Sequence, residues 1–154
     1  MKILLVSDSH GNSDKLKELV NMYPSMDYYL HAGDSGLDQI TLFPYLSVKG
    51  NTDYYPFDNL LRLYTPIGYL LLKHQPNFTN EQINNNTIFI HGHTHQYLIY
   101  LDNNGKIFIN PGSLILPRDN SHGSYAVLDI EKTKSSIIIY DIETKNILTN
   151  KQIR

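Results

Sequence analysis

The side chains of this sequence that could do chemistry are mainly those of histidine, aspartate and asparagine. Its 154 residues include seven histidines and no cysteine. The lack of cysteine excludes disulfide bonds, thiol catalysis and thiolate metal sites together. A bound metal ion would therefore have to be held by imidazole nitrogens and by oxygens.

Five clusters of such residues each come directly after an apolar run. They are Asp8-Ser9-His10, Gly33-Asp34, Gly50-Asn51-Thr52-Asp53, His74 and Gly92-His93-Thr94-His95. Ligands bind at the carboxyl ends of the strands in open α/β sheets, so we expect the five loops to share one crevice. They would present two carboxylates, one carboxamide and four imidazoles, which is a set of metal ligands rather than a nucleophile with a base.

The spacing inside two of the clusters bears on how many ions they would hold. Asp8 and His10 lie two residues apart, and so do His93 and His95. In an extended segment both side chains of a pair leave on the same side and can reach one ion. In a turn the same pair would equally address two neighbouring ions, and both arrangements stay open at this point.

Strands must position these clusters, and the apolar runs predict where the strands lie. The expected strands cover residues 2–7, 27–32, 45–49, 60–64, 69–73, 87–91, 97–102, 106–110, 124–130, 136–142 and 146–149. A helix is expected from Ser13, its N-cap, to Pro24, and a loop or short helix over residues 35–43.

The order of these elements indicates the fold class. The β-α-β-(α)-β opening favours parallel strands with a right-handed crossover. In the second half, the turn at residues 65–68 and a type I′ turn at Asn104-Gly105 predict hairpins, so antiparallel pairing should take over there. Helical content should be low after residue 85. One mixed sheet, or two packed sheets with helices outside, would accommodate this order.

Composition and charge exclude several classes of protein. The length fits one domain over residues 1–154, and 41% hydrophobic residues are enough for a core. No apolar stretch approaches the roughly 20 residues of a membrane span, and no secretory signal is present. A net charge of −2 without a basic block argues against an extended nucleic-acid surface. We therefore expect a soluble cytoplasmic protein, with a homo-oligomer possible.

The five clusters, in their order, resemble the motif blocks of the calcineurin-like metallophosphoesterases, which read D-x-H, G-D, G-N-x-D, H and G-H-x-H. Within that family the chain is similar to the small phosphodiesterase group of bacteria and archaea. That group also carries N-P-G-S followed by P-R, which stand here as Asn110-Pro111-Gly112-Ser113 and Pro117-Arg118. The resemblance spans residues 3 to about 130 of the chain.

The resemblance implies a fold and a cofactor. The fold would be α/β, with two mixed β-sheets in a sandwich flanked by helices (αββα) and few helices in the C-terminal half. The cofactor would be two divalent metal ions, with manganese favoured and iron, nickel or zinc possible. The first ion would be held by Asp8, His10, Asp34 and His95, and the second by Asp34, Asn51, His74 and His93, so that Asp34 bridges them.

The resemblance also implies a reaction. Two such ions, about 3.5–4 Å apart, can polarise a phosphoryl group and ionise a bridging water that attacks it. The chain would thus be a phosphodiesterase acting on a small phosphodiester, with Asp34, Asn51 and His93 as catalytic residues. A phosphomonoesterase is one alternative. A catalytically silent scaffold, like the retromer subunit that resembles these enzymes, is another, and the intact ligand set argues against it.

Two positions depart from the family pattern. Larger relatives, notably the phosphoprotein phosphatases, have a histidine after the Gly-Asn pair that acts as a general acid or steadies the transition state, but this chain has Thr52 there. Protonation of the leaving group therefore lacks an obvious donor, which favours diesters with good leaving groups. Gln75 replaces a glycine, and residues 76–86 form a shorter connection than in relatives, so the rim of the pocket should differ.

Several other polar residues have weaker claims on the site. Asp53 is expected to support the Asn51 loop by a hydrogen bond rather than to bind metal. His31 would be either a partner of the ligands or a plain strand residue, and a structural role is slightly preferred for His91. A surface role is expected for His122, and an exposed arginine such as Arg118 needs no function although it could contact a phosphate.

Overall fold

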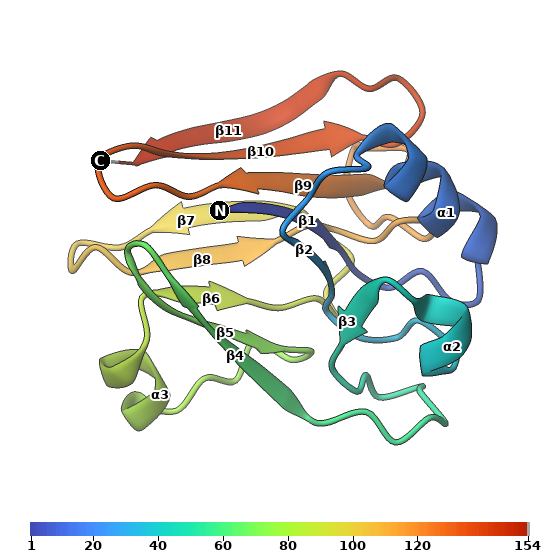
Figure 1. Ribbon diagram of the computed structural model, residues 1–154, viewed down its shortest axis with the longest axis horizontal. Helices are drawn as coiled ribbons and strands as arrows, with labels where there is room; N and C mark the ends of the chain where they lie inside the picture. Colours follow the sequence, from blue (N-terminus) through green and yellow to red (C-terminus); the bar gives the residue numbers. More distant parts are fainter. Residues whose placement is uncertain (154) are drawn as a thin grey trace.

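Two β-sheets packed face to face form the body of the computed structural model, which describes residues 1–153 (Figure 1). The strands of the first sheet are β1 (Lys2–Val6), β2 (Tyr28–His31), β3 (Tyr45–Ser47), β9 (Ser124–Asp129), β10 (Ser135–Asp141) and β11 (Ile147–Ile153). Its order is β11-β10-β9-β1-β2-β3. Strands β1, β2 and β3 are parallel, whereas β9 is antiparallel to β1. The sheet is therefore mixed.

The second sheet is also mixed. Its strands are β4 (Leu60–Thr65), β5 (Gly68–Lys73), β6 (Ile88–Ile90), β7 (Leu98–Leu101) and β8 (Ile107–Asn110), in the order β4-β5-β6-β8-β7. The two hairpins are antiparallel as expected, but β6 pairs in parallel with both β5 and β8. The prediction that antiparallel pairing takes over is thus wrong for β6, because the long segment after β5 lets the chain cross over before it re-enters the sheet.

The first strand shows why its sequence is a continuous apolar run. Ile3 and Leu5 point into the core between the two sheets, while Leu4 and Val6 pack on the outer side, and all four side chains are fully buried. Alternate residues of a strand face opposite sides, so a strand covered on both faces has no polar positions.

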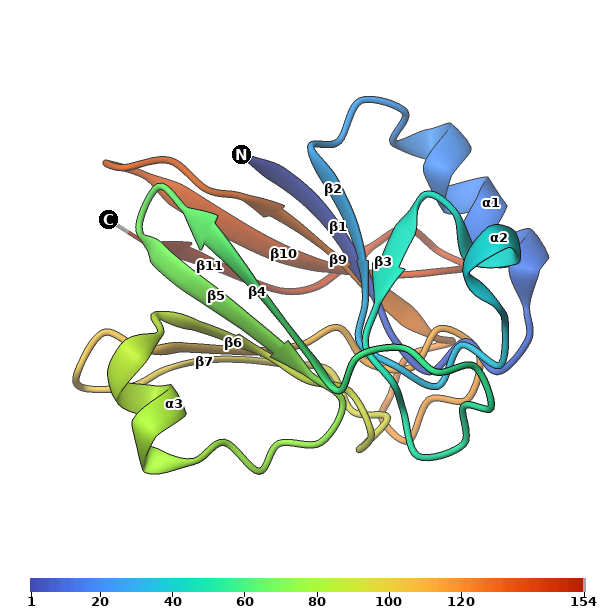
Figure 2. The same ribbon diagram turned by 60° about the horizontal axis from the view of Figure 1, so that its bottom comes forward.

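Three helices lie outside the sheets among the described residues. They are α1 (Ser13–Met22), α2 (Gln39–Leu42) and α3 (Asn80–Asn85). Figure 2 shows α1 and α2 beside the first sheet, and α3 beside the second. Leu16 and Leu19 of α1 join Leu42 of α2 and outward-facing residues of β1 in a second buried cluster. The predicted α/β sandwich of two mixed sheets flanked by helices is therefore confirmed.

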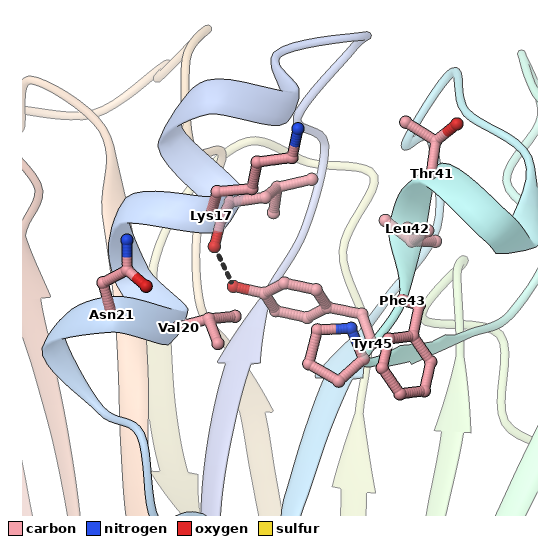
Figure 3. A pocket seen from close by; sticks show the side chains of 9 residues that line it. Lys17, Val20, Asn21, Thr41, Leu42, Phe43 and Tyr45 are labelled. Carbon is pink, nitrogen blue, oxygen red and sulfur yellow. Dashed lines mark hydrogen bonds between the residues drawn. The ribbon is translucent and has the colours of Figure 1, made fainter.

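One buried tyrosine ties α1 to the sheet. The hydroxyl of Tyr45 donates a hydrogen bond to the Leu16 carbonyl at 2.8 Å, across a small hollow between α1 and residues 41–45 (Figure 3). Burial raises the pKa of Tyr45 well above its usual value, so the hydroxyl stays protonated at neutral pH. This hydrogen bond anchors α1, the helix that follows the loop of Asp8 and His10.

Local details differ from the sequence-based predictions at three places. The N-cap of α1 is Asn12 rather than Ser13, because the Asn12 carboxamide accepts a hydrogen bond from the Lys15 N–H. The loop between β7 and β8 is not a type I′ turn, because only Gly105 has a positive φ there and Asn104 does not. The segment 76–86 contains α3, which begins with a capping box at Thr79. Within residues 1–153, no helix is long and apolar enough to cross a membrane.

Candidate metal centre

The carboxyl ends of strands from both sheets meet at one edge of the sandwich, and the five clusters meet there. Asp8 Oδ1, after β1, lies 3.1 Å from His95 Nε2, after β6, and 4.0 Å from His74 Nε2, after β5. His10 Nε2 lies 4.0 Å from the same oxygen. Two groups of side chains therefore have ligand atoms within 4.8 Å of one another: Asp8 with His10 and His95, and Asp8 with Asp34 and His74.

Asp8 has a buried oxygen with no protein partner. Its Oδ2 accepts hydrogen bonds from the Ser7 hydroxyl and from the His93 N–H, but Oδ1 has no hydrogen bond although the side chain is fully buried. His10 Nε2 is buried and unpaired as well. A buried carboxylate without a partner is costly, and a buried polar atom of this kind calls for an ion or a ligand. The two orphaned atoms fit a cation between them.

Backbone carbonyls orient two of the imidazoles. The Nδ1 atoms of His74 and His95 lie 2.7 Å from the carbonyls of Ala32 and Leu116, respectively. An Nδ1–H that donates to a carbonyl leaves the Nε2 lone pair free, and this is how metal-binding histidines are usually fixed. Both Nε2 atoms then face the Asp8 carboxylate, where only a cation or a proton can make the contact favourable.

Asn51 brings His93 into the same site. Its carboxamide oxygen lies 2.9 Å from His74 Nε2 and 3.2 Å from His93 Nδ1. The centroids of the two imidazole rings are 5.2 Å apart. Three of the side chains assigned to the second ion therefore lie together.

Asp34 is held between a backbone amide and an imidazole. Its Oδ1 accepts a hydrogen bond from the Thr52 N–H at 2.9 Å, and its Oδ2 lies 3.4 Å from His74 Nε2. Burial alone would raise the pKa of Asp34, but these hydrogen bonds outweigh burial and hold the pKa well below its usual value. For His74 burial alone would lower the pKa, and contacts with Asp34 and the Ala32 carbonyl raise it instead. The Asp34 side chain is therefore a carboxylate anion at neutral pH.

The structure does not test which carboxylate bridges two ions. Asp8 belongs to both groups of ligand atoms, and Asp34 belongs to one of them. The assignment of Asp34 as the bridge stays a prediction, as do the assignments of the seven ligands to particular ions and of Asp34, Asn51 and His93 to catalysis.

The backbone of the site is unusual. In the described part of the chain six residues other than glycine have a positive φ, and all but Lys145 are predicted ligands: Asp8, His10, Asp34, His93 and His95. Each such residue costs about 1–2 kcal/mol relative to ordinary backbone. Strain of this kind persists where function requires it. The loops are thus turns rather than extended segments, which removes the simple geometric argument for one ion per pair.

Glycines let the loops approach the ligands. A Cβ atom at Gly92 would lie 2.6 Å from Asp8 Oδ2 and would clash with the Ser7 hydroxyl, and one at Gly50 would overlap the Asp34 carboxylate and backbone. No side chain fits at either position. The clusters therefore need glycine at these two positions for space.

Two other residues brace the loops. Asp53 accepts hydrogen bonds from the N–H groups of Gly50, Asp34 and Gly36, as expected for a residue that supports this loop. His31 is fully buried and accepts a hydrogen bond from the Gly33 N–H through Nδ1, so its neutral ring donates from Nε2 to Ser9 Oγ at 2.8 Å. Burial, together with the neighbouring His74, lowers the pKa of His31 to about 3. His31 is thus a partner of the ligand loops.

The remaining residues with weaker claims are His91, His122 and Arg118. His91 is buried, and its Nδ1 lies 3.1 Å from the Gly92 carbonyl. The exposed ring of His122 lies 3.0 Å from Asp141, on the surface as expected. The backbone of Arg118 is tied to the last motif, since its N–H donates to the His95 carbonyl and its carbonyl accepts a hydrogen bond from the Gln96 side chain.

Sequence reasoning missed some residues that hold the ligands in place. Ser7 donates to the Asp8 carboxylate, and Ser113 of the N-P-G-S segment donates to the Asp8 carbonyl at 2.8 Å. Asn110 donates to the Gly92 carbonyl and to the Thr94 hydroxyl. A serine at the end of an apolar strand was the available signal for Ser7. The N-P-G-S segment therefore lies beside the metal centre.

The chain is similar to known proteins in both sequence and structure. Residues 1–133 match the calcineurin-like phosphoesterase superfamily domain. The chain is 31% identical over 157 residues to the probable metallophosphoesterase YsnB of Bacillus subtilis (strain 168), covering 92% of this chain and 91% of that protein. A predicted phosphoesterase from Streptococcus pneumoniae TIGR4 superposes with a TM-score of 0.83 at 25% identity, covering 99% of this chain and 96% of the other. Vacuolar Protein Sorting 29 from Cryptosporidium parvum superposes with a TM-score of 0.75 at 18% identity, covering 99% and 97%.

Fold and site together define an α/β sandwich with a nitrogen and oxygen ligand set at the shared edge of its two sheets. Because the family match covers most of the chain, the protein belongs to the calcineurin-like phosphoesterase superfamily. Membership in this family implies divalent metal ions and hydrolysis of phosphoric esters. The family resemblance expected from the five clusters is therefore confirmed.

Proposed function

We propose that this protein is a metal-dependent phosphodiesterase that hydrolyses a small phosphodiester with two metal ions. The observation that supports it most is the unpaired, fully buried Asp8 Oδ1, which three imidazoles approach within 4.0 Å. When bound, two divalent ions would polarise the phosphoryl group and supply an ionised water. Manganese is the proposed ion because the family resemblance favours it, while nitrogen and oxygen ligands without sulfur suit manganese, iron, nickel and zinc alike. The cytoplasm is the proposed compartment.

The residues around the site favour a diester over a phosphoprotein. Thr52 stands where larger relatives have a histidine, and its N–H is already used by Asp34 Oδ1. Its side chain cannot act as an acid at neutral pH, so the leaving group must depart without strong protonation. Asp34 and Asn51 would hold the ions beside His93, whose ring is partly exposed and can approach a bound phosphate.

The test is hydrolysis of bis(p-nitrophenyl) phosphate by protein dialysed against a chelator, with and without added Mn²⁺. We expect a rate that depends on the added metal, and a loss of at least about 100-fold for Asp34→Asn, which weakens the ligand set. Asp58→Asn is the control, because Asp58 is exposed and its carboxylate has no hydrogen bond among residues 1–153. No hydrolysis with Mn, Fe, Ni or Zn would refute the proposal.

Two other functions compete with this one. A phosphomonoesterase would hydrolyse p-nitrophenyl phosphate faster than the diester, so the ratio of the two rates separates them. The structural likeness to Vacuolar Protein Sorting 29 favours a scaffold as the second alternative, because that neighbour shares the fold over almost the whole chain. Tight binding of two ions without turnover of either ester would support the scaffold.

A further inference from the structure

A pocket of about 400 Å³ lies beside the candidate metal centre and shares two side chains with it. Asn51 and His74, both predicted metal ligands, line the pocket on one side. The other lining residues are Lys49, Gly50, Asn59, Lys73, Gln75 and Asn77. We call this hollow the lysine pocket. Because the two sites share a wall, a substituent of a phosphate held at the metal centre would extend into it.

The lysine pocket carries positive charge that the protein does not neutralise. Two lysines and no acidic residue line it, and its other side chains are uncharged at neutral pH or belong to the metal centre. Neither Lys49 nor Lys73 forms an ion pair with any residue that the structure describes. A concave surface with charge of one sign concentrates ligands of the opposite sign.

Two hydrogen bonds hold the Lys73 ammonium group in place and leave one of its N–H donors free. Its Nζ donates to the Asn77 carbonyl at 3.1 Å and to Gln82 Oε1 at 3.3 Å, and lies 5.5 Å from the centre of the Phe78 ring. Gln82 is itself fixed, because Oε1 also accepts the Thr79 N–H in the capping box of α3. An ammonium group has three N–H donors, so one remains for a ligand. The short connection after Gln75 thus positions a cation at the wall of the pocket.

Lys49 supplies a second ammonium group without a partner. Its backbone N–H donates to the Asp58 carbonyl at 2.8 Å, which fixes the main chain next to the Gly50-Asn51 pair. The side chain is exposed, and its Nζ makes no hydrogen bond to any of residues 1–153. The four-carbon stem of an unpartnered lysine lets its ammonium group reach an anion in the pocket, and the charge-assisted contact must offset the side-chain entropy lost on binding.

We propose that the lysine pocket binds an anionic group on the part of the substrate that does not leave, so that the preferred substrates are phosphodiesters carrying a further phosphate or carboxylate. This inference rests on the proposed function, because it names the substrate class of the same site. The pocket volume lies within the range of about 300–1,000 Å³ found for small-molecule sites. Charge-assisted hydrogen bonds from two lysines would distinguish such substrates from neutral ones.

The test compares two p-nitrophenyl phosphodiesters with the same leaving group, one with a phosphoethyl substituent and one with a neutral methoxyethyl substituent. The readout is the ratio of their kcat/KM values on the manganese-loaded protein. We expect the wild type to prefer the phosphoethyl diester, and Lys49→Met and Lys73→Met each to lower the ratio about 3- to 10-fold, the usual weight of one charged hydrogen bond. Lys151→Met, on the exposed strand β11, should keep the wild-type ratio.

Each outcome decides the proposal separately from the proposed function. A wild-type ratio near one, or a ratio that neither pocket variant lowers, would overturn the assignment of the lysine pocket while leaving the phosphodiesterase intact. If the wild type hydrolyses neither diester, the proposed function fails, and calorimetric titration of both compounds decides the pocket. Tighter binding of the phosphoethyl diester, lost in Lys49→Met, would support the pocket, and equal binding would overturn it. Lys49 is exposed, so its variant should fold even if Lys73→Met disturbs α3.

Discussion

At the scale of single residues, the Asp8 carboxylate should lower the stability of the metal-free fold while it provides a ligand for metal. We expect Asp8→Asn to raise the free energy of unfolding of the chelator-treated protein by about 1–3 kcal/mol, because it removes a buried charge whose Oδ1 atom has no hydrogen bond. The new amide would face His95 Nε2, which lies 3.1 Å from Oδ1 and has a free lone pair because Nδ1 donates to a carbonyl. Chemical denaturation with and without chelator measures the effect.

The same variant should lose stabilisation by manganese, which the wild type should show. Asp58→Asn, an exposed change, should alter neither stability nor the response to metal. Destabilisation of the chelator-treated protein by Asp8→Asn would mean that the carboxylate has a partner that the hydrogen-bond geometry does not reveal.

The positive φ of His93 gives a second prediction at this scale. At φ 69° a side chain is strained, so His93→Gly should be more stable than His93→Ala by about 1 kcal/mol. Both variants remove the same imidazole contacts, so their difference isolates the backbone, and thermal or denaturant unfolding measures it. Lys145, with a φ of 61° outside the site, is the matched control, and the same pair of changes there should show the same order. Alanine more stable than glycine at position 93 would show that the loop is not strained.

At the scale of elements, the strands and the loops after them followed from the sequence to different degrees. The apolar run of β1 predicted a strand buried on both faces, and Asp8 at its end was correctly placed at the shared edge. The carbonyls that orient His74 and His95 could not be predicted, because a main-chain carbonyl has no residue-type signal. The positive φ values could not be predicted either, because the spacing of Asp8 and His10 is compatible with a strand or a turn.

Helix α3 was missed because its sequence gives almost no apolar period. Asn80–Asn85 is polar apart from Ile83, and its start depends on the reciprocal hydrogen bonds of Thr79 and Gln82. A capping box pattern was the available signal. The turn at Asn104 was predicted from a dipeptide preference. Residues 102–106 instead form a longer loop, in which the Asp102 carboxylate accepts hydrogen bonds from the N–H groups of Asn104 and Lys106.

The turn after β10 gives a prediction about how the stability of the protein changes at low pH. The buried Asp141 carboxylate accepts hydrogen bonds from the N–H groups of His122, Glu143 and Thr144 and from the His122 ring. Burial alone would raise the pKa of Asp141, but these bonds lower it well below its usual value. We expect Asp141→Asn to lower the free energy of unfolding at pH 7 by about 2 kcal/mol, since hydrogen bonds to a charged group are lost.

The difference between wild type and Asp141→Asn should shrink in acid. A carboxyl group with a lowered pKa stabilises the fold above its unfolded pKa of about 3.9, and this stabilisation is lost as the pH falls toward the folded pKa. Urea unfolding between pH 7 and pH 3 measures the effect, with Asp58→Asn as the exposed control. A difference that stays constant with pH would show that Asp141 is not a stabilising anion.

At the scale of the whole molecule, the metal centre joins the two sheets. Asp8, His10, Asp34 and Asn51 follow strands of the first sheet, while His74, His93 and His95 follow strands of the second. A direct hydrogen bond crosses between these loops, from the His93 N–H to Asp8 Oδ2 at 3.1 Å. Ions held by both sets would stabilise the sandwich as well as serve catalysis, because a ligand that binds only the folded state raises its stability.

The central claim is that these side chains hold a pair of ions, and a manganese titration of chelator-treated protein followed by electron paramagnetic resonance tests it most directly. The account predicts saturation at two ions per chain and the spectrum of a spin-coupled pair, with the coupled spectrum lost in Asp8→Asn. Saturation at a single ion with the spectrum of isolated manganese, or no binding at all, would contradict it.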